Sequence, residues 1–261
     1  MNRREFHLLR NTSMLFAILV FFTQVCAAQA YRYLSMEDGL GSQKVYRILQ
    51  DSLGYMWFLT QEGPDRYNGK EIKHYELTDK GQKLNMQFNL NWLYMAGDGA
   101  LWGIGRKGRI FRYELERDRF EQVYMPSQPE KGIASPNITY SYMDHSGRIW
   151  LCSKEQITLF DTRTEKAFPL SCDIISNITS IEQMDGMNFF IGTESGLYQA
   201  ILDEQHMSLT CKSAYDLHIP VSELFFSDTL KNCLSVLSNR GFGFVISILL
   251  RKLVRTELLA M

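Results

Sequence analysis

The 261-residue sequence predicts an all-β protein built from about five repeats of 40–48 residues, because similar four-residue segments recur along it. Each segment begins with Trp, Phe or Leu, called its anchor here, and the anchors are 45, 48, 40 and 44 residues apart. The segments are Trp57–Thr60, Trp102–Gly105, Trp150–Ser153, Phe190–Thr193 and Leu234–Leu237. One four-stranded sheet cannot bury both of its faces, so repeats of this length are typical of the stacked blades of a β-propeller.

Tight turns separate the strands within each repeat. A glycine stands three residues before each of these tryptophans, and Asp51–Gly54 and Asp144–Gly147 are typical four-residue turns. Alternating β-branched and aromatic residues between the turns predict strands, including fourth strands at 71–75 and 120–124, and exclude a helical repeat. The first strand of each repeat is expected to begin twelve residues before the anchor, at Val45, Leu90, Ile138 and Ile178. The anchor rings should pack between neighbouring blades.

Residues 1–30 predict a secretory signal peptide, which places the mature chain, 31–261, in the periplasm. Arg3, Arg4 and Arg10 precede a twelve-residue apolar run, and Ala28–Ala30 supplies small residues at a cleavage site. The run is short for a membrane span, which takes about 20 residues. An uncleaved anchor and a lipoprotein attached through Cys26 remain as alternatives.

The charges and cysteines exclude several classes of function. The chain has 28 basic and 29 acidic residues, so it lacks the positive charge of a nucleic-acid-binding protein. The mature cysteines form no Cys-x-x-Cys pair, which leaves a zinc site or redox motif unsupported. We expect them to be small buried residues, with disulfide pairing left open. They are Cys152, Cys172, Cys211 and Cys233. No cofactor or metal is expected.

The first repeat resembles a known family. Residues 33–40 read Tyr-Leu-Ser-Met-Glu-Asp-Gly-Leu, residues 54–57 read Gly-Tyr-Met-Trp, and residues 60–69 read Thr-Gln-Glu-Gly-Pro-Asp-Arg-Tyr-Asn-Gly. This resembles the two-component regulator propeller, the periplasmic sensor region of hybrid two-component system histidine kinases, which in gut bacteria detects glycan breakdown products. The resemblance covers about residues 31–245 and is most specific over 31–75, although Pro64 replaces the leucine usual there.

The resemblance implies a longer parent protein. Full members of the family carry two seven-bladed propellers, a β-sandwich, a transmembrane helix, a kinase, a receiver and a DNA-binding domain. Here about five blades occupy 31–245, followed by a tail at 246–261 that is irregular or an amphipathic helix. The expected product is a truncated sensor that is not itself an enzyme. In a closed propeller residues 31–35 would form the strand that completes the last blade. Five blades built for a seven-bladed ring instead predict an open or strained arc, whose exposed strand edges would favour self-association.

A ligand site is expected at one end of the propeller, where loops entering the first strand meet loops joining the second and third. Asparagines recur there thirteen residues before an anchor, and rings lie further along the first strands. The residues predicted to bind are Lys44, Asn89, Trp92, Arg106, Asn137, Tyr140 and Asn177. Amide, charged and aromatic groups together suit an oligosaccharide. The alternative is that the asparagines are ordinary turn residues.

The rival class is a short secreted propeller enzyme, a carbohydrate lyase or hydrolase. Asp51, Asp144 and Asp185 are the candidate acids, but all three occupy the turn between the first and second strands. The Asp144–Gly147 spacing does not fit a sialidase-type aspartate box, and the chain has no nucleophile-elbow or zinc-protease motif. The sequence therefore favours turn roles for these aspartates.

Overall fold

The computed structural model describes residues 32–84, 90–126, 137–173, 177–214, 220–227, 233–238 and 244–249, and the signal segment expected at 1–30 lies outside them. All the strands belong to one compact unit, Ser35–Met261. Apart from one 3₁₀ turn, η1 (Met36–Asp38), the regular elements in the described ranges are β-strands. No helix among these residues is long and apolar enough to cross a membrane.

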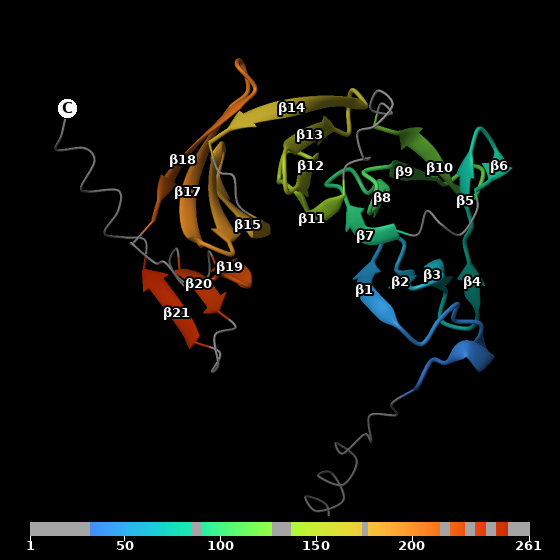
Figure 1. Ribbon diagram of the computed structural model, residues 1–261. Coiled ribbons are helices and arrows are strands. Elements are labelled where there is room, and N and C mark those ends of the chain that lie inside the picture. Colours follow the sequence, from blue (N-terminus) through green and yellow to red (C-terminus); the bar gives the residue numbers. More distant parts are fainter. Residues whose placement is uncertain are drawn as a thin grey trace, which may run out of the picture. The chain divides into compact units, whose positions relative to one another are not determined.

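The strands form consecutive antiparallel blades, each a meander that follows the chain (Figure 1). Blade 1 contains β1 (Val45–Gln50), β2 (Met56–Thr60), β3 (Gly63–Tyr67) and β4 (Ile72–His74). Blade 2 contains β7 (Leu90–Met95), β8 (Leu101–Gly105), β9 (Ile110–Glu114) and β10 (Arg119–Tyr124). Blade 3 contains β11 (Ile138–Met143), β12 (Arg148–Ser153), β13 (Ile157–Asp161) and β14 (Lys166–Cys172). Blade 4 contains β15 (Ile178–Asp185), β16 (Asn188–Thr193), β17 (Gly196–Asp203) and β18 (Ser208–Ser213). Blade 5 contains β19 (Glu223–Ser227), β20 (Cys233–Ser238) and β21 (Phe244–Leu249). The predicted repeat and its second-strand anchors are confirmed.

Successive blades pack face to face through clusters of buried apolar side chains. Trp57 lies in the cluster between blades 1 and 2, Trp102 in that between blades 2 and 3, and Trp150 in that between blades 3 and 4. Each indole is at most 2% exposed, and the Trp150 ring lies 4.7 Å from that of Phe189 in blade 4. The expected role of the anchors is thus confirmed for these three, whose burial supplies much of the apolar contact between blades.

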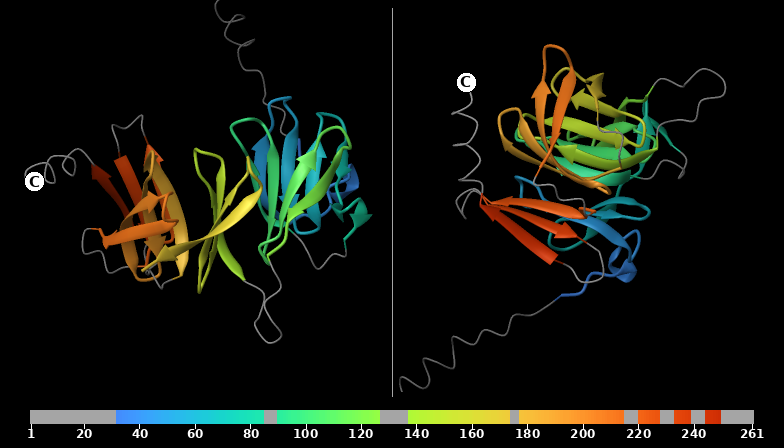
Figure 2. Two further views of the ribbon diagram at one scale, coloured as in Figure 1. Left: turned by 90° about the horizontal axis from the view of Figure 1, so that it is seen from above. Right: turned by 60° about the vertical axis from the view of Figure 1, so that its left-hand side comes forward.

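Outer strands also join neighbouring blades. After β4, the chain forms a small outer hairpin of β5 (Leu77–Asp79) and β6 (Gln82–Lys83), and β5 pairs in parallel with β10 of blade 2. In the same way β14 of blade 3 pairs in parallel with β18 of blade 4, which creates an eight-stranded sheet from two blades (Figure 2). The sequence analysis does not anticipate either pairing.

A β-bulge recurs at one repeat position in the first strand of blades 1 to 4. The pairing register shifts between Val45 and Arg47, and at the equivalent steps of the other three strands. A bulge inserts one unpaired residue and redirects the side chains that follow it. The redirected residues stand ten positions before each anchor: Arg47, Trp92, Tyr140 and Ser180.

Both ends of the predicted propeller region need correction. Residues 246–249 were expected to begin the tail but belong to β21; a continuous apolar run fits a buried strand as well as a helix. The remaining tail residues lie outside the described part of the chain. At the other end, residues 32–35 form no strand, and the backbone N–H of Gly41 instead donates to the buried Asp65 carboxylate of β3 at 2.8 Å. The loop that precedes β1 is therefore held to β3 by a polar contact.

Candidate ligand-binding site

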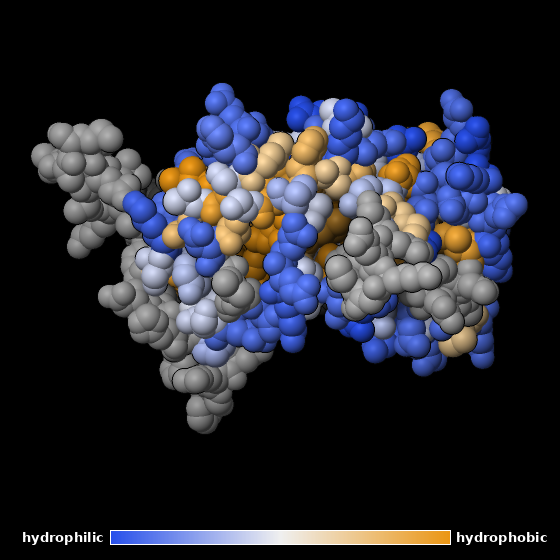
Figure 3. All heavy atoms as spheres, turned by 45° about the horizontal axis from the view of Figure 1, so that its top comes forward, coloured by the Kyte–Doolittle hydropathy of each residue, from blue (hydrophilic) through white to orange (hydrophobic). Residues whose placement is uncertain are grey.

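A cavity of about 430 Å³ lies between the first strands of all five blades. These strands face one another across the cavity, and β1, β7, β11, β15 and β19 each contribute to its wall. In the four blades with a bulge, the redirected residue ten positions before the anchor lines it. A cavity of this size falls within the range that holds small ligands. Seen from outside, the molecule presents hydrophilic side chains with apolar patches between them (Figure 3).

Two tyrosines of β11 accept hydrogen bonds from backbone N–H groups along the inner edge of β15. The Tyr140 hydroxyl accepts a hydrogen bond from the backbone N–H of Ile181 at 3.3 Å, and the Tyr142 hydroxyl accepts one from Gln183 at 3.1 Å. Burial raises the pKa of both phenols well above the ordinary value, so both stay protonated. Since each oxygen already accepts a bond, its own O–H proton is available to a ligand in the cavity.

Side chains of the first strands also hydrogen-bond the backbone of the next blade between blades 2 and 3 and between blades 1 and 2, here as donors to carbonyl groups. The Tyr94 hydroxyl of β7 donates to the backbone carbonyl of Ser141 in β11, and burial raises its pKa to about 12. The Arg47 guanidinium of β1 donates to the carbonyl of Leu93 at 3.4 Å and lies 4.9 Å from the centre of the Tyr94 ring. Arg47 is thus held by a carbonyl and a ring face.

Blade 4 breaks this pattern. Where β11 has Tyr140 and Tyr142, β15 has the shorter Ser180 and Glu182. Ser180 is 3% exposed and lines the cavity. Its buried hydroxyl makes no hydrogen bond within the described structure. The carboxylate of Glu182 also makes no hydrogen bond or ion pair with the described residues, and burial raises its pKa to about 7.

The cavity therefore combines rings, hydroxyl donors and an unpaired carboxylate. Ser141, 2% exposed, adds a second buried hydroxyl without a hydrogen-bond partner in the described part of the chain. Buried polar groups are normally satisfied, so these unsatisfied groups mark a place where a polar ligand would be stabilised.

Two of the seven residues predicted to bind, Trp92 and Tyr140, line the cavity. Asn177 lies at the entry to β15, where its side-chain amide donates to Glu194 at 2.9 Å. Asn137 and Arg106 are exposed, and the Arg106 carbonyl accepts from the backbone of Ile138 at the start of β11. These contacts bring the two expected sets of loops together at one end of a blade.

Lys44 lies at the corresponding end of blade 1. Its ammonium group is 5.3 Å from the centre of the Tyr46 ring, and its carbonyl accepts from the backbone N–H of Gln61 at 3.0 Å. Asn89 lies outside the described residues. Neither Lys44 nor the exposed rim residues line the cavity. A ligand role at this rim stays a prediction.

The cavity residues Arg47, Ser180 and Glu182 were not among those predicted to bind. The signal was present in the repeat alignment: ten residues before the anchors stand Arg, Trp, Tyr and Ser, and eight residues before them stand Leu, Tyr, Tyr and Glu. The bulge directs the residue ten positions before the anchor into the cavity. The residue eight positions before the anchor lies two positions further along the same strand and therefore on the same face.

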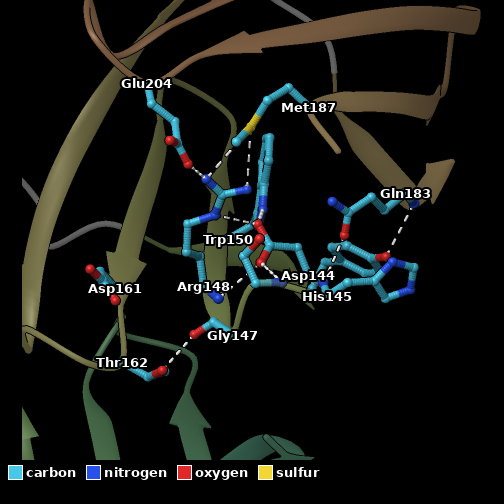
Figure 4. Close-up of polar contacts among 12 residues, drawn as sticks. Asp144, His145, Gly147, Arg148, Trp150, Asp161, Thr162, Gln183, Met187 and Glu204 are labelled. Atoms are coloured by element: carbon cyan, nitrogen blue, oxygen red, sulfur yellow. Dashed lines mark hydrogen bonds and ion pairs between the residues drawn. The ribbon is translucent and has the colours of Figure 1, made fainter. Parts of the chain in front are cut away.

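A second polar cluster surrounds Asp144 in the turn before β12 (Figure 4). One carboxylate oxygen accepts from the backbone N–H groups of Ser146 and Arg148 at 3.0 and 2.9 Å. The other accepts from Arg148 Nε at 2.6 Å and from Trp150 Nε1 at 3.0 Å. With four donors bound, this carboxylate is occupied by its own blade, which supports the turn role predicted for it.

Arg148 connects this cluster to blade 4. It is 4% exposed, donates to Glu204 and lies 3.8 Å from the Met187 sulfur (Figure 4). The backbone N–H of His145 also donates to Gln183 at 2.7 Å, across the same blade interface. These contacts join blades 3 and 4 on the turn side of the sheets and hold Arg148 in place.

Comparisons with known proteins agree with the architecture. A family model described as the two component regulator propeller matches residues 39–62. No curated protein matches the sequence. The fold is similar to the extracellular domain of a protein from B. thetaiotaomicron described as a hybrid two component system, with a TM-score of 0.58 and 20% identity. That match covers 80% of this chain but only 29% of the other chain.

Other propellers are similar to a comparable degree. Virginiamycin B lyase from Staphylococcus aureus matches with a TM-score of 0.56 and 12% identity, over 80% of this chain and 71% of the lyase. The Swd1 β-propeller domain from Myceliophteria thermophila matches with a TM-score of 0.55 and 12% identity, over 84% of this chain and 69% of the other. At these identities the likenesses establish the fold alone, and they confirm the predicted β-propeller class.

Proposed function

We propose that this chain, which carries a two component regulator propeller repeat, is the ligand-sensing part of a hybrid two-component signalling protein, that it works in the periplasm, and that its ligand is a glycan-derived sugar. The family match at residues 39–62 and the fold of the B. thetaiotaomicron extracellular domain support the signalling role. The sugar ligand is the one that the family resemblance implies, and the chemistry of the cavity supports it.

One observation carries the proposal: the cavity has both ring faces and free hydroxyl donors. Trp92 supplies an indole on which the apolar face of a sugar ring can lie, while Tyr140 and Tyr142 each keep an O–H proton. The Glu182 carboxylate can accept from sugar hydroxyls. Sugars need this combination, because each ring has apolar C–H faces and a rim of hydroxyl groups.

The test is a binding isotherm of the full chain with a panel of mono- and disaccharides, measured by calorimetry. We expect saturable binding of one sugar per chain, with Trp92→Ala lowering affinity at least about tenfold. Asn137→Ala is the matched variant at the rim. If Asn137→Ala removes binding and Trp92→Ala does not, the ligand lies at the rim and the cavity proposal is wrong.

A second candidate function is catalysis on a carbohydrate, by a lyase or hydrolase mechanism. The observation favouring it is Glu182, a carboxylate inside a cavity with a pKa of about 7, as a general acid or base at neutral pH requires. Sustained release of reducing or unsaturated sugar by the full chain, lost in Glu182→Gln, would favour this function. Binding without turnover would favour the sensor.

A further inference from the structure

We infer that the sugar recognised by the cavity carries a primary amine, and that its ammonium group lies against the Glu182 carboxylate. This inference rests on the proposed function and narrows the substrate class of the same site. It depends on three features of the cavity: its charge, the state of Glu182, and the groups around that carboxylate.

The charged groups in the cavity wall favour a cation. Three charged side chains line it, namely Arg47, Glu182 and Glu223, so the carboxylates outnumber the guanidinium by one. One Arg47 N–H donates to the Leu93 carbonyl and the guanidinium lies against the Tyr94 ring, but neither contact neutralises its charge. With both carboxylates ionised, the three groups together carry one negative charge, which favours a cation over an anion.

Glu182 is the group that a cation would stabilise most. Its carboxylate is partly removed from water and bonds to no described side chain or backbone group. Placing a charge in such a site is costly unless a partner compensates it. A sugar hydroxyl compensates only in part, whereas an ammonium group forms a charge-assisted hydrogen bond, about twice as strong as a neutral one.

Aromatic faces and hydroxyls complete the site. Tyr94, Tyr140 and Tyr142 line the same cavity with Trp92, and ring faces attract cations. The Arg47 guanidinium over the Tyr94 ring is an example of that attraction within this cavity. The unpartnered Ser180 hydroxyl stands two residues before Glu182 and can hydrogen-bond a sugar hydroxyl beside the amine.

The repeat pattern explains why, of blades 2 to 4, only blade 4 provides a carboxylate at this position. The position of Glu182 is Tyr94 in blade 2 and Tyr142 in blade 3, where the side chain bonds the next blade's backbone. In blade 4 the equivalent side chain is shorter and charged and leaves the bond unmade. The carboxylate therefore faces space that a ligand can fill.

The test compares glucosamine, glucose and N-acetylglucosamine by calorimetry with the full chain near neutral pH. We expect glucosamine to bind at least about tenfold more tightly than glucose, and N-acetylglucosamine to lose the advantage because its amide carries no charge. In Glu182→Gln, which keeps the shape but removes the charge, the preference for glucosamine should disappear. Glu116→Gln, an exposed acid in the turn between β9 and β10, should keep it.

The outcomes separate the two proposals. If glucose and glucosamine bind equally well to the native chain, or if Glu182→Gln keeps the preference, the amine inference is wrong while sugar binding stands. If none of the three sugars and no member of the wider panel binds, the proposed function itself fails.

Discussion

Blades 3 and 4 share one architecture but satisfy their polar groups differently. In blade 3 the Trp150 indole donates to Asp144, and the tyrosines of β11 bond to the backbone of β15. In blade 4 the anchor is Phe190, which has no N–H to satisfy, and β15 presents Ser180 and Glu182 without partners among the described residues.

The difference teaches how a repeat acquires a site. A long side chain on the inner strand stabilises the next blade, whereas a short polar one at the same position leaves a cavity and an unsatisfied group. Functional sites are commonly less stable than the scaffold that carries them. In this pair, blade 3 makes the hydrogen bonds between the blades, and blade 4 supplies the cavity's unpartnered Ser180 and Glu182 side chains.

The largest expected effect comes from breaking the blade 3 turn. Asp144→Ala removes four accepted hydrogen bonds and leaves the buried Arg148 without one of its two carboxylate partners, so the free energy of unfolding should fall by about 3 kcal/mol. Urea denaturation measures this. The control is Asp185→Ala in the corresponding turn of blade 4, where the exposed aspartate bonds only Asn188 and the loss should stay below about 0.5 kcal/mol. Equal losses in the two variants would contradict the comparison.

The second prediction makes blade 4 resemble blade 3. Glu182→Tyr puts the blade 3 residue at the equivalent position, fills part of the cavity and removes the carboxylate. We expect sugar binding to weaken at least about tenfold in calorimetry, with the thermal unfolding midpoint preserved. Unchanged affinity in a folded variant would show that the ligand does not use this position.

A smaller effect is expected from a single inter-blade hydrogen bond. Tyr142→Phe removes the hydroxyl that accepts from Gln183, which should lower the free energy of unfolding by about 1 kcal/mol in urea. Tyr46→Phe is the control, since its ring is 47% exposed and its hydroxyl bonds no described residue. If both variants lose the same stability, the hydroxyl of Tyr142 does not join the blades.

The smallest effect concerns the pH dependence of stability. Because the folded-state pKa of Glu182 is raised to about 7, the folded chain holds this proton more tightly than the unfolded chain does. Stability from this group is full below the ordinary glutamate pKa and is lost as the pH rises through about 7. Glu182→Gln should therefore be more stable than the native chain at pH 8, by less than about 1 kcal/mol given its partial exposure, and nearly equal at pH 5. A gain at pH 5 equal to that at pH 8 would exclude ionisation as the cause.

The sequence predicted the blades because their signals are local. Anchor spacing, turn glycines and alternating apolar residues each depend on a few neighbouring positions, as around Trp102 and Trp150. The rim loops followed from topology. The cavity followed only in part, through the predicted Trp92 and Tyr140. Its other residues did not, because a bulge turns Arg47 and Ser180 inward, and because Glu182 is shorter than the equivalent tyrosines of blades 2 and 3. A bulge changes the pairing of strands far apart in the chain, and no single repeat reveals it.

The parallel pairing of β14 with β18 has a mechanical consequence. The eight strands of blades 3 and 4 run continuously from β11 to β15, and these two end strands face each other with tyrosine hydroxyls bridging them. The two blades thus form one sheet that folds back on itself. The line along which β11 faces β15, called the seam here, lies along the cavity. Among the described residues, two tyrosine hydrogen bonds cross the seam, whereas β14 and β18 are joined by two backbone residue pairs, and the apolar cluster around Trp150 packs between the two blades. A ligand in the cavity would therefore touch the seam directly, because both bridging tyrosines line the cavity wall, whereas the outer strands β14 and β18 do not.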